Sequence, residues 1–580
     1  MRTLLIFLVV ALLAAGCGAT PSTPAPRSQS PVAGESTPPT AAPMPSTTPS
    51  ATPEAAIGIG AAVVTVSDSL RVRSAPGVSE DSVKYEPLLP VGTDLLVVGG
   101  PVEGSGYVWW QVEPLSFALQ DASVGWVAMA DHDGEPWIAL AGDGTPALGM
   151  AVSDVARMPV RKGDAKAAAN SIGAFGLDLY GRLLEDPNLR SDNVVFSPTS
   201  IALALGMART GARGETGAEI DDVLHTGGSD ELLNGLNALD QALSARDGTW
   251  KDYDGKRELA LRIANASFGQ NGWDIEQSYL DSLAATFGSG LHLVDYKADP
   301  EAARQAINGW VSQRTAGRIP ELLGTPDVTS ATRLVLVNAI YMKAEWEGWF
   351  NEDATEKAPF ARLDGSKVDV DMMVQSGGGQ GPVIPYARGS GWRAVDLRYK
   401  SPPGASPLAM TVVLPEDLQA FESKLDGDLL ERIVGKLDAE RQSFAEPDCP
   451  PEYTDAGCYP YDLRLFLPRF SIDTRAALAE LLAAAGIARA FDPATADFSG
   501  INQQEQLYIS SVIHQANIDV DEHGTEAAAA TAIGMDTGGG PSALDQHTIR
   551  FDRPFLFFVR DVETGAILFM GRVVDPASIP

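Results

Sequence analysis

A segment of small residues between strand-like stretches constrains the fold of this chain more than any other feature. Residues 508–521 alternate apolar and other side chains, as a half-buried strand does, and residues 555–559 and 567–573 are bulky and apolar. Between them, residues 522–532 read Glu-His-Gly-Thr-Glu-Ala-Ala-Ala-Ala-Thr-Ala and show no apolar stripe. Most such segments are surface loops. A segment without bulk can also slide between two existing strands, because its inward side chains need little room.

This segment and its surroundings resemble a known family. Residues 522–531 together with Arg-Pro-Phe-Leu-Phe-Phe at 553–558 resemble the hinge and closing strands of a serpin. Further stretches resemble serpin segments in the family's order, namely 193–205, 211–216, 263–266, 307–311, 315–319, 336–341, 372–375, 413–415, 467–470, 496–499 and 569–573. Many independent pieces at compatible separations are far more specific than one motif. The resemblance implies a mixed α/β (α+β) serpin fold, with a large central β-sheet and surrounding helices.

The resemblance also implies a suicide-substrate mechanism. In the family, a protease attacks an exposed reactive loop and forms an acyl-enzyme, and the cleaved loop then inserts into a five-stranded central sheet and drags the protease with it. The native state is therefore metastable. The matching hinge residues are Glu522, Gly524, Thr525, Glu526, Ala527, Ala528, Ala529, Ala530 and Thr531. Only Glu526 is charged between 525 and 532, at a position that faces solvent after insertion in the family, which favours an inhibitory serpin over a non-inhibitory one.

Four polar residues match a network beneath the opening of the central sheet in serpins: Ser197, Ser200, Asn338 and His514. Ser197 and His514 could instead be the nucleophile and base of a hydrolase, but the chain has no Gly-x-Ser-x-Gly elbow. A buried histidine with hydroxyl and amide neighbours is more often a member of a satisfied network. We therefore expect no catalytic residue, and an inhibitor of serine-type endopeptidases in place of an enzyme.

Three positions take roles from the resemblance at the top of the sheet. Glu522 and Arg469 match a salt bridge of the family, and Trp346 matches the breach, where the sheet opens. An exposed pair of this kind is worth under about 1 kcal/mol. We therefore expect its loss to act mainly on rates, by opening the sheet early and favouring polymers between the loop of one molecule and the sheet of another.

The resemblance places the reactive bond in the window 535–544. The family's usual spacing from the hinge puts the cut between Gly538 and Gly539, but this loop is longer than usual, so other bonds stay open. The candidate residues are Gly538, Gly539, Met535, Thr537 and Leu544. No Lys or Arg occurs from 533 to 546. A trypsin-like protease needs a cation for its specificity pocket, so elastase-, subtilisin- or chymotrypsin-like proteases are favoured.

The first 166 residues divide by composition. Residues 1–17 resemble a lipoprotein-type signal peptide that ends at Cys17, the residue that would carry the lipid. Ordinary secretion stays open, because Ala14 stands where that signal usually has Leu. Residues 18–56 are a Pro/Ser/Thr-rich disordered tether.

Residues 57–141 contain short β-type runs broken by Gly and Pro, which favour a small all-β barrel. Leu-Arg-Val-Arg-Ser-Ala-Pro-Gly at 70–77, Trp-Trp-Gln-Val at 109–112 and Gly-Trp-Val at 125–127 resemble a bacterial SH3-like domain, whose relatives often bind cell-wall peptides. The tryptophans suit a core or a binding platform equally. Residues 142–166 are then a linker, and 167–580 the serpin domain.

Composition excludes several functions. The net charge is −33, from 76 acidic and 43 basic residues, which argues against nucleic acid. Six histidines without metal-binding spacing and three cysteines predict no metal, and we expect no cofactor. Cys449 and Cys458 flank a loop that looks like an insertion relative to the family. In an exported protein they favour a disulfide, with two separate thiols as the alternative.

Together these observations predict a monomeric serpin, either anchored to a bacterial membrane as an extracytoplasmic lipoprotein or secreted. It would trap a serine protease, or a cysteine protease, by acylation and loop insertion. A non-inhibitory serpin is the nearest alternative. A lipoprotein that binds the cell wall through the SH3-like domain is the alternative from another class.

Overall fold

The structure is a computed structural model that describes residues 57–58, 61–66, 70–78, 82–89, 93–114, 124–131, 136–140, 149–186, 189–252, 255–377, 383–445, 461–525 and 545–578. The chain divides into two compact units, Met1–Glu54 and Ala55–Pro580. The first unit lies outside the described residues.

Residues 57–140 contain a seven-stranded antiparallel sheet with its own apolar core. The strands are β1 Ala62–Thr65, β2 Leu70–Arg73, β3 Lys84–Leu89, β4 Asp94–Gly104, β5 Tyr107–Pro114, β6 Gly125–Ala128 and β7 Ile138–Leu140, in the order β3-β2-β6-β5-β4-β1-β7. Trp109 and Trp110 are buried, and Nε1 of Trp109 donates to the carbonyl oxygen of Gly104 at 2.7 Å. These two tryptophans therefore belong to the interior and form no exposed platform.

Glycine and proline break the strand pattern of this sheet less than the sequence suggests. β4 runs from Asp94 to Gly104, through register shifts between Val97 and Gly99 and between Gly99 and Val102. A Cβ at Gly100, where φ is +101°, would lie 2.8 Å from the carbonyl oxygen of Trp109. The glycines here accommodate bulges within the strand instead of ending it.

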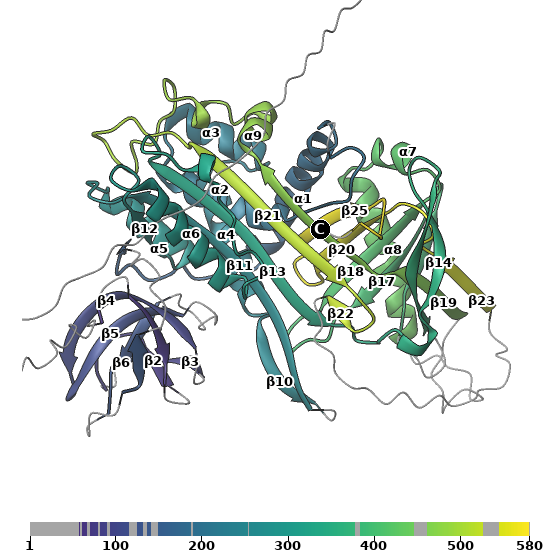
Figure 1. The fold of residues 1–580 in the computed structure, drawn as a ribbon, viewed down its shortest axis with the longest axis horizontal. Coiled ribbons are helices and arrows are strands. Elements are labelled where there is room, and N and C mark those ends of the chain that lie inside the picture. The colour runs from purple at the N-terminus through teal and green to yellow at the C-terminus, as the bar shows by residue number, and fades with distance from the viewer. Residues whose placement is uncertain are drawn as a thin grey trace, which may run out of the picture. The chain divides into compact units, whose positions relative to one another are not determined.

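The largest sheet lies in the centre of the remaining chain and contains the predicted site. Its strands are β8 Gly149–Ala151, β10 Gly248–Asp252, β11 Gly255–Gln270, β12 Leu291–Val294, β13 Leu334–Glu345, β20 Phe470–Ala477, β21 Ser511–Val520 and β22 Gly524–Thr525. Their order is β20-β21-β22-β13-β11-β12-β8, and β10 pairs with β11. Figure 1 shows β11, β13 and β21 side by side, with β22 at one end of the pair β13 and β21.

Part of the stretch predicted as a linker joins the edge of this sheet. β8 pairs with β12, and a Cβ at Gly290 would lie 2.4 Å from the carbonyl oxygen of Ala151, so only glycine permits this approach. Farther along, the amide of Met158 donates to the carbonyl oxygen of Ala285 at 2.7 Å. The edge is thus covered by a segment that composition alone marks as a connection.

Two smaller sheets complete the fold. One has the order β14-β15-β19-β23 and the other β16-β17-β18-β24-β25-β9. Their strands are β9 Val194–Phe196, β14 Glu356–Ala361, β15 Lys367–Gly377, β16 Tyr386–Gly389, β17 Trp392–Arg398, β18 Leu408–Pro415, β19 Tyr461–Pro468, β23 Asp545–Arg550, β24 Phe555–Asp561 and β25 Ile567–Val573. The stretches 555–559 and 567–573 are buried strands, as their sequence predicts.

Helices cover both faces of the central sheet, with α6 on one face and α2 on the other. The helices of the described residues are α1 Asp164–Leu183, α2 Pro198–Gly211, α3 Gly214–Val223, α4 Ser229–Ser244, α5 Gln277–Phe287, α6 Pro300–Arg314, α7 Leu418–Glu422, α8 Gly427–Ala445 and α9 Ala479–Ala485, with 3-10 turns η1 Thr325–Asp327, η2 Glu352–Ala354 and η4 Arg489–Phe491. Odd positions of β13 and Ile513 of β21 share an apolar core with α6, and even positions share the larger core with α2.

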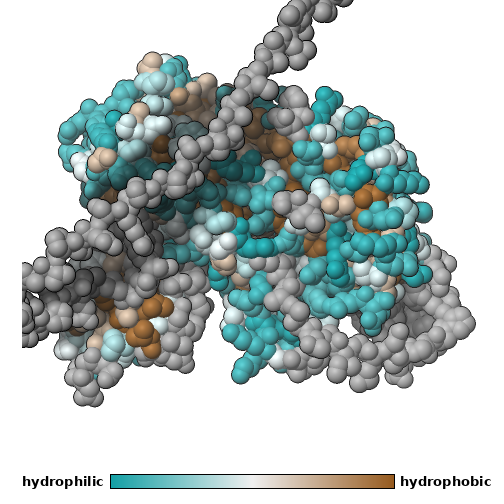
Figure 2. All heavy atoms as spheres, viewed as in Figure 1, coloured by the Kyte–Doolittle hydropathy of each residue, from teal (hydrophilic) through white to brown (hydrophobic). Residues whose placement is uncertain are grey.

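The face of the molecule shown in Figure 2 is largely hydrophilic, with hydrophobic residues in separate patches. Among the described residues, the exposed large hydrophobic side chains are Val66, Val78, Val83, Val102, Val155, Val160 and Leu363. Among the helices of the described residues, none is long and apolar enough to cross a membrane.

Candidate functional site at the seam of the central sheet

The predicted site lies where β13 meets β21, a boundary that we call the seam. We call the part of the seam nearer the amino-terminal ends of β13 and β21 the lower part, and the part nearer their carboxyl-terminal ends the upper part. In the lower part, the two strands pair directly and in parallel, from Val335 opposite Ser511 to Ile340 opposite Ala516. In its upper part, β22 lies between them, since Thr525 is opposite both Ala344 and Val520. The first residues of the small-residue segment are therefore already part of the sheet.

A tight turn leads from β21 into β22. The Oδ1 atom of Asp521 accepts hydrogen bonds from the amides of His523, at 2.8 Å, and Gly524, at 3.1 Å. A Cβ at Gly524 would lie 2.0 Å from the carbonyl oxygen of Ala344. Glycine is thus required at the predicted hinge position, because no side chain fits between the turn and β13.

Thr525 is buried beneath the sheet and anchored by an aromatic pair. Its hydroxyl lies 2.7 Å from the hydroxyl of Tyr399, whose ring stacks on Trp346 at 4.3 Å between centroids. Burial raises the pKa of Tyr399, so this hydroxyl keeps its proton. Trp346, the predicted breach residue, donates its Nε1 hydrogen to the carbonyl oxygen of Asp521 at 3.0 Å and its backbone hydrogen to that of His523 at 2.7 Å. Trp346 and Tyr399 together fix the turn and the first inserted side chain.

The structure brings Glu522 and Arg469 together at 2.7 Å, between Oε2 and Nε. The two side chains differ sharply in exposure, 2% for Glu522 and 47% for Arg469. The hydroxyl of Thr355 also contacts the Glu522 carboxylate, and the hydrogen bond that Arg469 donates to Glu522 raises the pKa of Arg469. The small value that applies to an exposed pair therefore does not apply here, because the Glu522 side chain is buried. Removing Arg469 would leave a buried carboxylate with fewer partners, which costs more than losing a surface ion pair.

The structure also brings together Ser197, Ser200, Asn338 and His514, all fully buried beneath the lower seam. The amide of Ser197 donates to Nε2 of His514 at 3.0 Å, and Nδ2 of Asn338 donates to Oγ of Ser200 at 2.8 Å. Oδ1 of Asn338 contacts Nδ1 of His514. Oγ of Ser197 accepts from the amide of Ser200 at 3.1 Å and so caps α2.

These contacts fix the tautomer of His514. Nε2 accepts from a backbone amide, so the proton is on Nδ1 and points to Asn338. Burial lowers the pKa of His514 to about 3, which keeps the ring neutral. A nucleophile and base need a hydrogen bond between them. Here His514 is bonded to the amide of Ser197, and Oγ of Ser197 faces Ser200, so the pair is not arranged for hydrolysis.

Three residues of the site were missed by the sequence analysis. Asn265 joins the lower network, where Nδ2 donates to the carbonyl oxygen of Ser200 at 2.8 Å and Oδ1 accepts from Asn338 at 2.8 Å. Tyr399 and Thr355 contact Thr525 and Glu522, respectively. The only signal for Asn265 was its place in a matched stretch, because its position opposite Asn338 depends on the register of β11 with β13.

Other predicted positions lie outside the described residues. They are Glu526, Ala527, Ala528, Ala529, Ala530 and Thr531 of the hinge, Met535, Thr537, Gly538, Gly539 and Leu544 of the window, and Cys17, Cys449 and Cys458. Within the described residues, no group of three or more His, Cys, Asp or Glu side chains is placed to hold a metal ion.

Comparison with known proteins agrees with this geometry. The family model described as Serpin (serine protease inhibitor) matches residues 170–576. The chain is 32% identical over 420 residues to an uncharacterized serpin-like protein of Thermococcus kodakarensis, covering 72% of this chain and 88% of that one. It is 33% identical to the human leukocyte elastase inhibitor, and the match covers 69% of this chain and 97% of that protein.

Solved structures share the fold. The native thermophilic serpin tengpin superimposes with a TM-score of 0.58 at 23% identity, covering 73% of this chain and 97% of tengpin. Uncleaved ovalbumin superimposes with a TM-score of 0.57 at 25% identity, covering 70% of this chain and 100% of ovalbumin. The predicted mixed fold with a large central sheet is thereby confirmed for the part of the chain that follows the seven-stranded sheet. On the family model, the relatives and the seam together, the chain belongs to the serpin family of serine protease inhibitors.

Proposed function

We propose that this serpin traps a serine protease, or a cysteine protease, by a suicide-substrate route. The observation that carries the proposal is the position of Gly524 and Thr525, already paired between β13 and β21. The residues that follow are Glu-Ala-Ala-Ala-Ala-Thr, small enough to continue along the seam once the loop is cut. The inward side of a strand extended from Thr525 would then carry only small side chains.

The chemistry of the first step belongs to the protease. Its nucleophile adds to the carbonyl carbon of a peptide bond in the window 535–544, the bond to nitrogen breaks, and the new amino terminus leaves with a proton from the protease's acid. The freed loop extends β22 into a full strand and carries the ester- or thioester-linked protease with it. Inhibition results if insertion outruns hydrolysis of that link.

Two observations support a class of target protease, namely the residues of the window 535–544 and the name of a relative. Met535, Thr537, Gly538, Gly539 and Leu544 suit small or apolar specificity pockets, and no cation occurs between 533 and 546. A relative at 33% identity is named for inhibiting leukocyte elastase. We therefore propose an elastase-, subtilisin- or chymotrypsin-like target, and no trapping of trypsin-like enzymes.

The proposal also includes an extracytoplasmic location. Cys17 would carry a lipid anchor to a bacterial membrane, or the chain would be secreted, with residues 57–141 as an SH3-like module that binds a cell-wall or other peptide ligand. Metabolic labelling with palmitate tests the anchor, since Cys17→Ser should abolish incorporation and release the protein to the medium. Labelling that persists in this variant would contradict the anchor.

Incubation of the full chain with elastase, subtilisin, chymotrypsin and trypsin, followed by denaturing electrophoresis, tests inhibition directly. We expect a covalent adduct with at least one of the first three and none with trypsin. Mass spectrometry of the released carboxyl-terminal peptide locates the cut. Cleavage without any adduct would favour a non-inhibitory serpin, and a stable trypsin complex would contradict the specificity argument.

The cell-wall alternative predicts a different result. A lipoprotein acting only through the amino-terminal sheet would bind cell-wall fragments with equal affinity after Thr525→Arg and would form no adduct with any protease. Binding without adducts would therefore replace the inhibitor proposal.

A further inference from the structure

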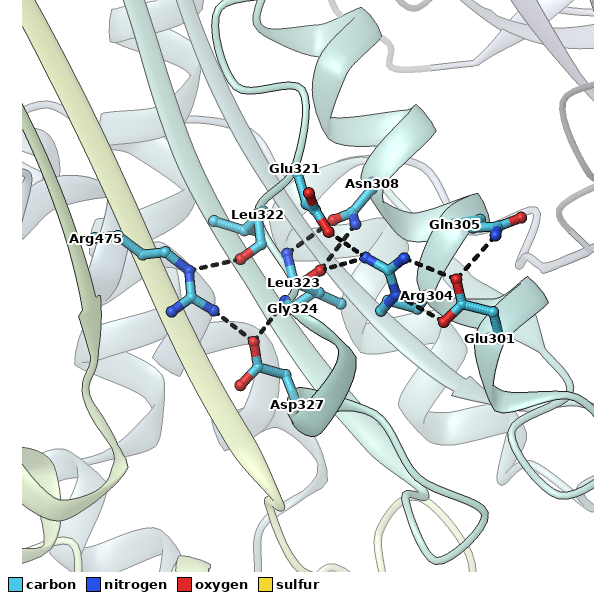
Figure 3. Close-up of polar contacts among 10 residues, drawn as sticks. All are labelled: Glu301, Arg304, Gln305, Asn308, Glu321, Leu322, Leu323, Gly324, Asp327 and Arg475. Carbon is cyan, nitrogen blue, oxygen red and sulfur yellow. Dashed lines mark hydrogen bonds and ion pairs between the residues drawn. The ribbon is translucent and has the colours of Figure 1, made fainter. Parts of the chain in front are cut away.

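The connection from α6 to β13, residues 315–333, contacts strands on the far side of the seam. Arg475 of β20 donates from Nε to the carbonyl oxygen of Leu322 at 2.9 Å and pairs with the carboxylate of Asp327 (Figure 3). Arg318 pairs with Asp519 of β21. Since β20 and β21 lie on one side of the seam and β13 on the other, both arginine contacts join the two halves of the sheet.

These contacts lie on the face of the sheet that α6 covers. Arg475 is opposite Gln515 in the register of β20 with β21, and Ser471 is opposite Asp519. Gln515 and Asp519 have the parity of Ile513, which shares its apolar core with α6. The two arginine contacts therefore cross the seam on this face, opposite the face on which Thr525 is buried.

The connection itself is fixed to α6. Asn308 accepts from the amide of Leu323 at 2.8 Å and donates to its carbonyl oxygen at 2.9 Å (Figure 3). Arg304 donates to the same oxygen at 2.9 Å and pairs with Glu301 at 2.7 Å and Glu321 at 2.6 Å. Because the connection is anchored to α6 in this way, it cannot follow β20 and β21 when they move away from β13. Such a movement must therefore stretch the contacts of Arg318 and Arg475.

An added strand would separate the two halves by one strand spacing. Neighbouring strands lie about 4.8 Å apart, so β21 must move from β13 by that distance to admit the loop. A hydrogen bond does not survive such a displacement. The contacts of Arg318 and Arg475 must therefore break before a strand passes them.

We propose that Arg318 and Arg475 form a clasp that controls how fast the central sheet opens. This inference rests on the proposed function, because it concerns the insertion step. A closed clasp slows insertion of the intact loop and so preserves the native state. The same clasp delays insertion after cleavage, so its strength also affects how many molecules are cleaved without trapping a protease.

Uptake of a synthetic peptide tests the clasp without any protease. The probe is an acetylated peptide with the sequence of residues 525–536, and its incorporation is followed by native electrophoresis and by resistance to urea. We expect Arg318→Ala and Arg475→Ala each to speed uptake about threefold, and the double variant about tenfold, because each contact is partly exposed and modest. Arg475→Lys keeps the pair with Asp327 and should lie between wild type and Arg475→Ala.

Arg489→Ala is the matched control. Arg489 of η4 is about as exposed as Arg475 and pairs with Glu219 of α3 at 3.4 Å, but neither of these two residues belongs to the central sheet. We expect the uptake rate of Arg489→Ala to equal that of wild type. Equal rates in wild type and the double variant, no uptake by the double variant, or equal acceleration by Arg489→Ala would each overturn the clasp.

The protease panel separates this inference from the proposed function. Peptide uptake that responds to the clasp variants, in a chain that forms no adduct with any protease, would support the clasp and contradict inhibition. Adduct formation by a chain whose peptide uptake rate does not change on substitution of Arg318 and Arg475 would support inhibition and contradict the clasp.

Discussion

The lower and upper parts of the seam are closed in different ways. Below, β13 and β21 pair directly over a buried, uncharged network of Asn265, Asn338 and His514. Above, β22 separates the same two strands, and part of what holds it is charged. There Arg469 pairs with Glu522.

This difference indicates where the sheet opens first. Buried hydrogen bonds among neutral groups leave unsatisfied partners on both sides when they break, whereas the exposed guanidinium of Arg469 can replace its partner with water even though the Glu522 carboxylate cannot. The upper part thus has one contact that water can partly replace, and it is also where the small-residue segment begins. Opening from the hinge downward would break that contact first and leave the lower network as the last barrier.

Thr525→Arg should produce the largest effect, because it changes the residue on which the upper part closes. Its side chain would enter a buried site against Tyr399, where an unpaired charge costs about 3–5 kcal/mol. We expect β22 to leave the sheet and the chain to be cleaved as a substrate. Titration of a trapped protease should show a strongly raised stoichiometry, while Thr525→Ser, which keeps the hydroxyl, should resemble wild type. An unchanged stoichiometry in Thr525→Arg would exclude insertion.

The fold was largely predictable from the sequence, but three short strands of the central sheet, β8, β10 and β22, were not. The strand pattern at 508–521 contains β21, and matched pieces in family order indicated the central sheet. β8 and β10 lie outside the short stretches that match serpin segments, and β22 has two residues in a segment without an apolar pattern, so nothing in the sequence marks these strands. Their pairing depends on neighbours distant in sequence, such as β12 for β8.

The site was predictable where a residue type matched the family, and unpredictable where register or burial decided. Ser197, Ser200 and His514 came from matched motifs. Asn265 enters the network only because β11 aligns it with Asn338. Glu522 also came from a matched position, but its burial could not be inferred from its residue type, because carboxylates are mostly exposed. Its burial results from the turn at Asp521 and from Thr355 and Phe350, whose amide donates to the Glu522 carbonyl at 3.0 Å.

Acid should weaken the lower part of the seam. The pKa of His514 is lowered to about 3, whereas an unfolded histidine titrates near 6.5, so between these values only the unfolded chain binds the proton. The free energy of unfolding therefore falls as the pH falls through this window, by up to about 1.4 kcal/mol per pH unit. Urea unfolding at about pH 7, 6 and 5 measures the slope.

A second histidine provides the control for this slope. Burial lowers the pKa of His292 to about 4, so it acts in the same direction. His514→Gln should reduce the slope of the free energy of unfolding against pH by the part that His514 contributes. His292→Gln should leave that part of the slope unchanged. A slope unchanged by His514→Gln would show that this ring is not the group that titrates.

Loss of Arg469 should weaken the upper part by less. Arg469→Met leaves the buried Glu522 carboxylate with Thr355, at a cost of about 1–3 kcal/mol. We expect faster assembly into loop-to-sheet polymers on mild heating, measured by light scattering. Lys297→Met removes a similar charge from an exposed pair with Glu505 at 3.0 Å and should cost under about 0.5 kcal/mol. Equal assembly rates in the two variants would argue against a special role for the buried carboxylate.

Salt should produce the smallest effect and the sharpest distinction between the two parts. Raising the ionic strength from about 0.05 to 0.5 M shortens the Debye length from about 14 to 4 Å, which weakens partly exposed pairs such as Arg469–Glu522 and Arg318–Asp519. The lower network contains no charge to screen. Hydrogen exchange should therefore quicken by less than about threefold in fragments that contain β22 and remain unchanged across residues 511–516. The same acceleration in both parts would mean that they open as one unit, and that the division drawn here between a charged upper closure and a neutral lower one has no kinetic consequence.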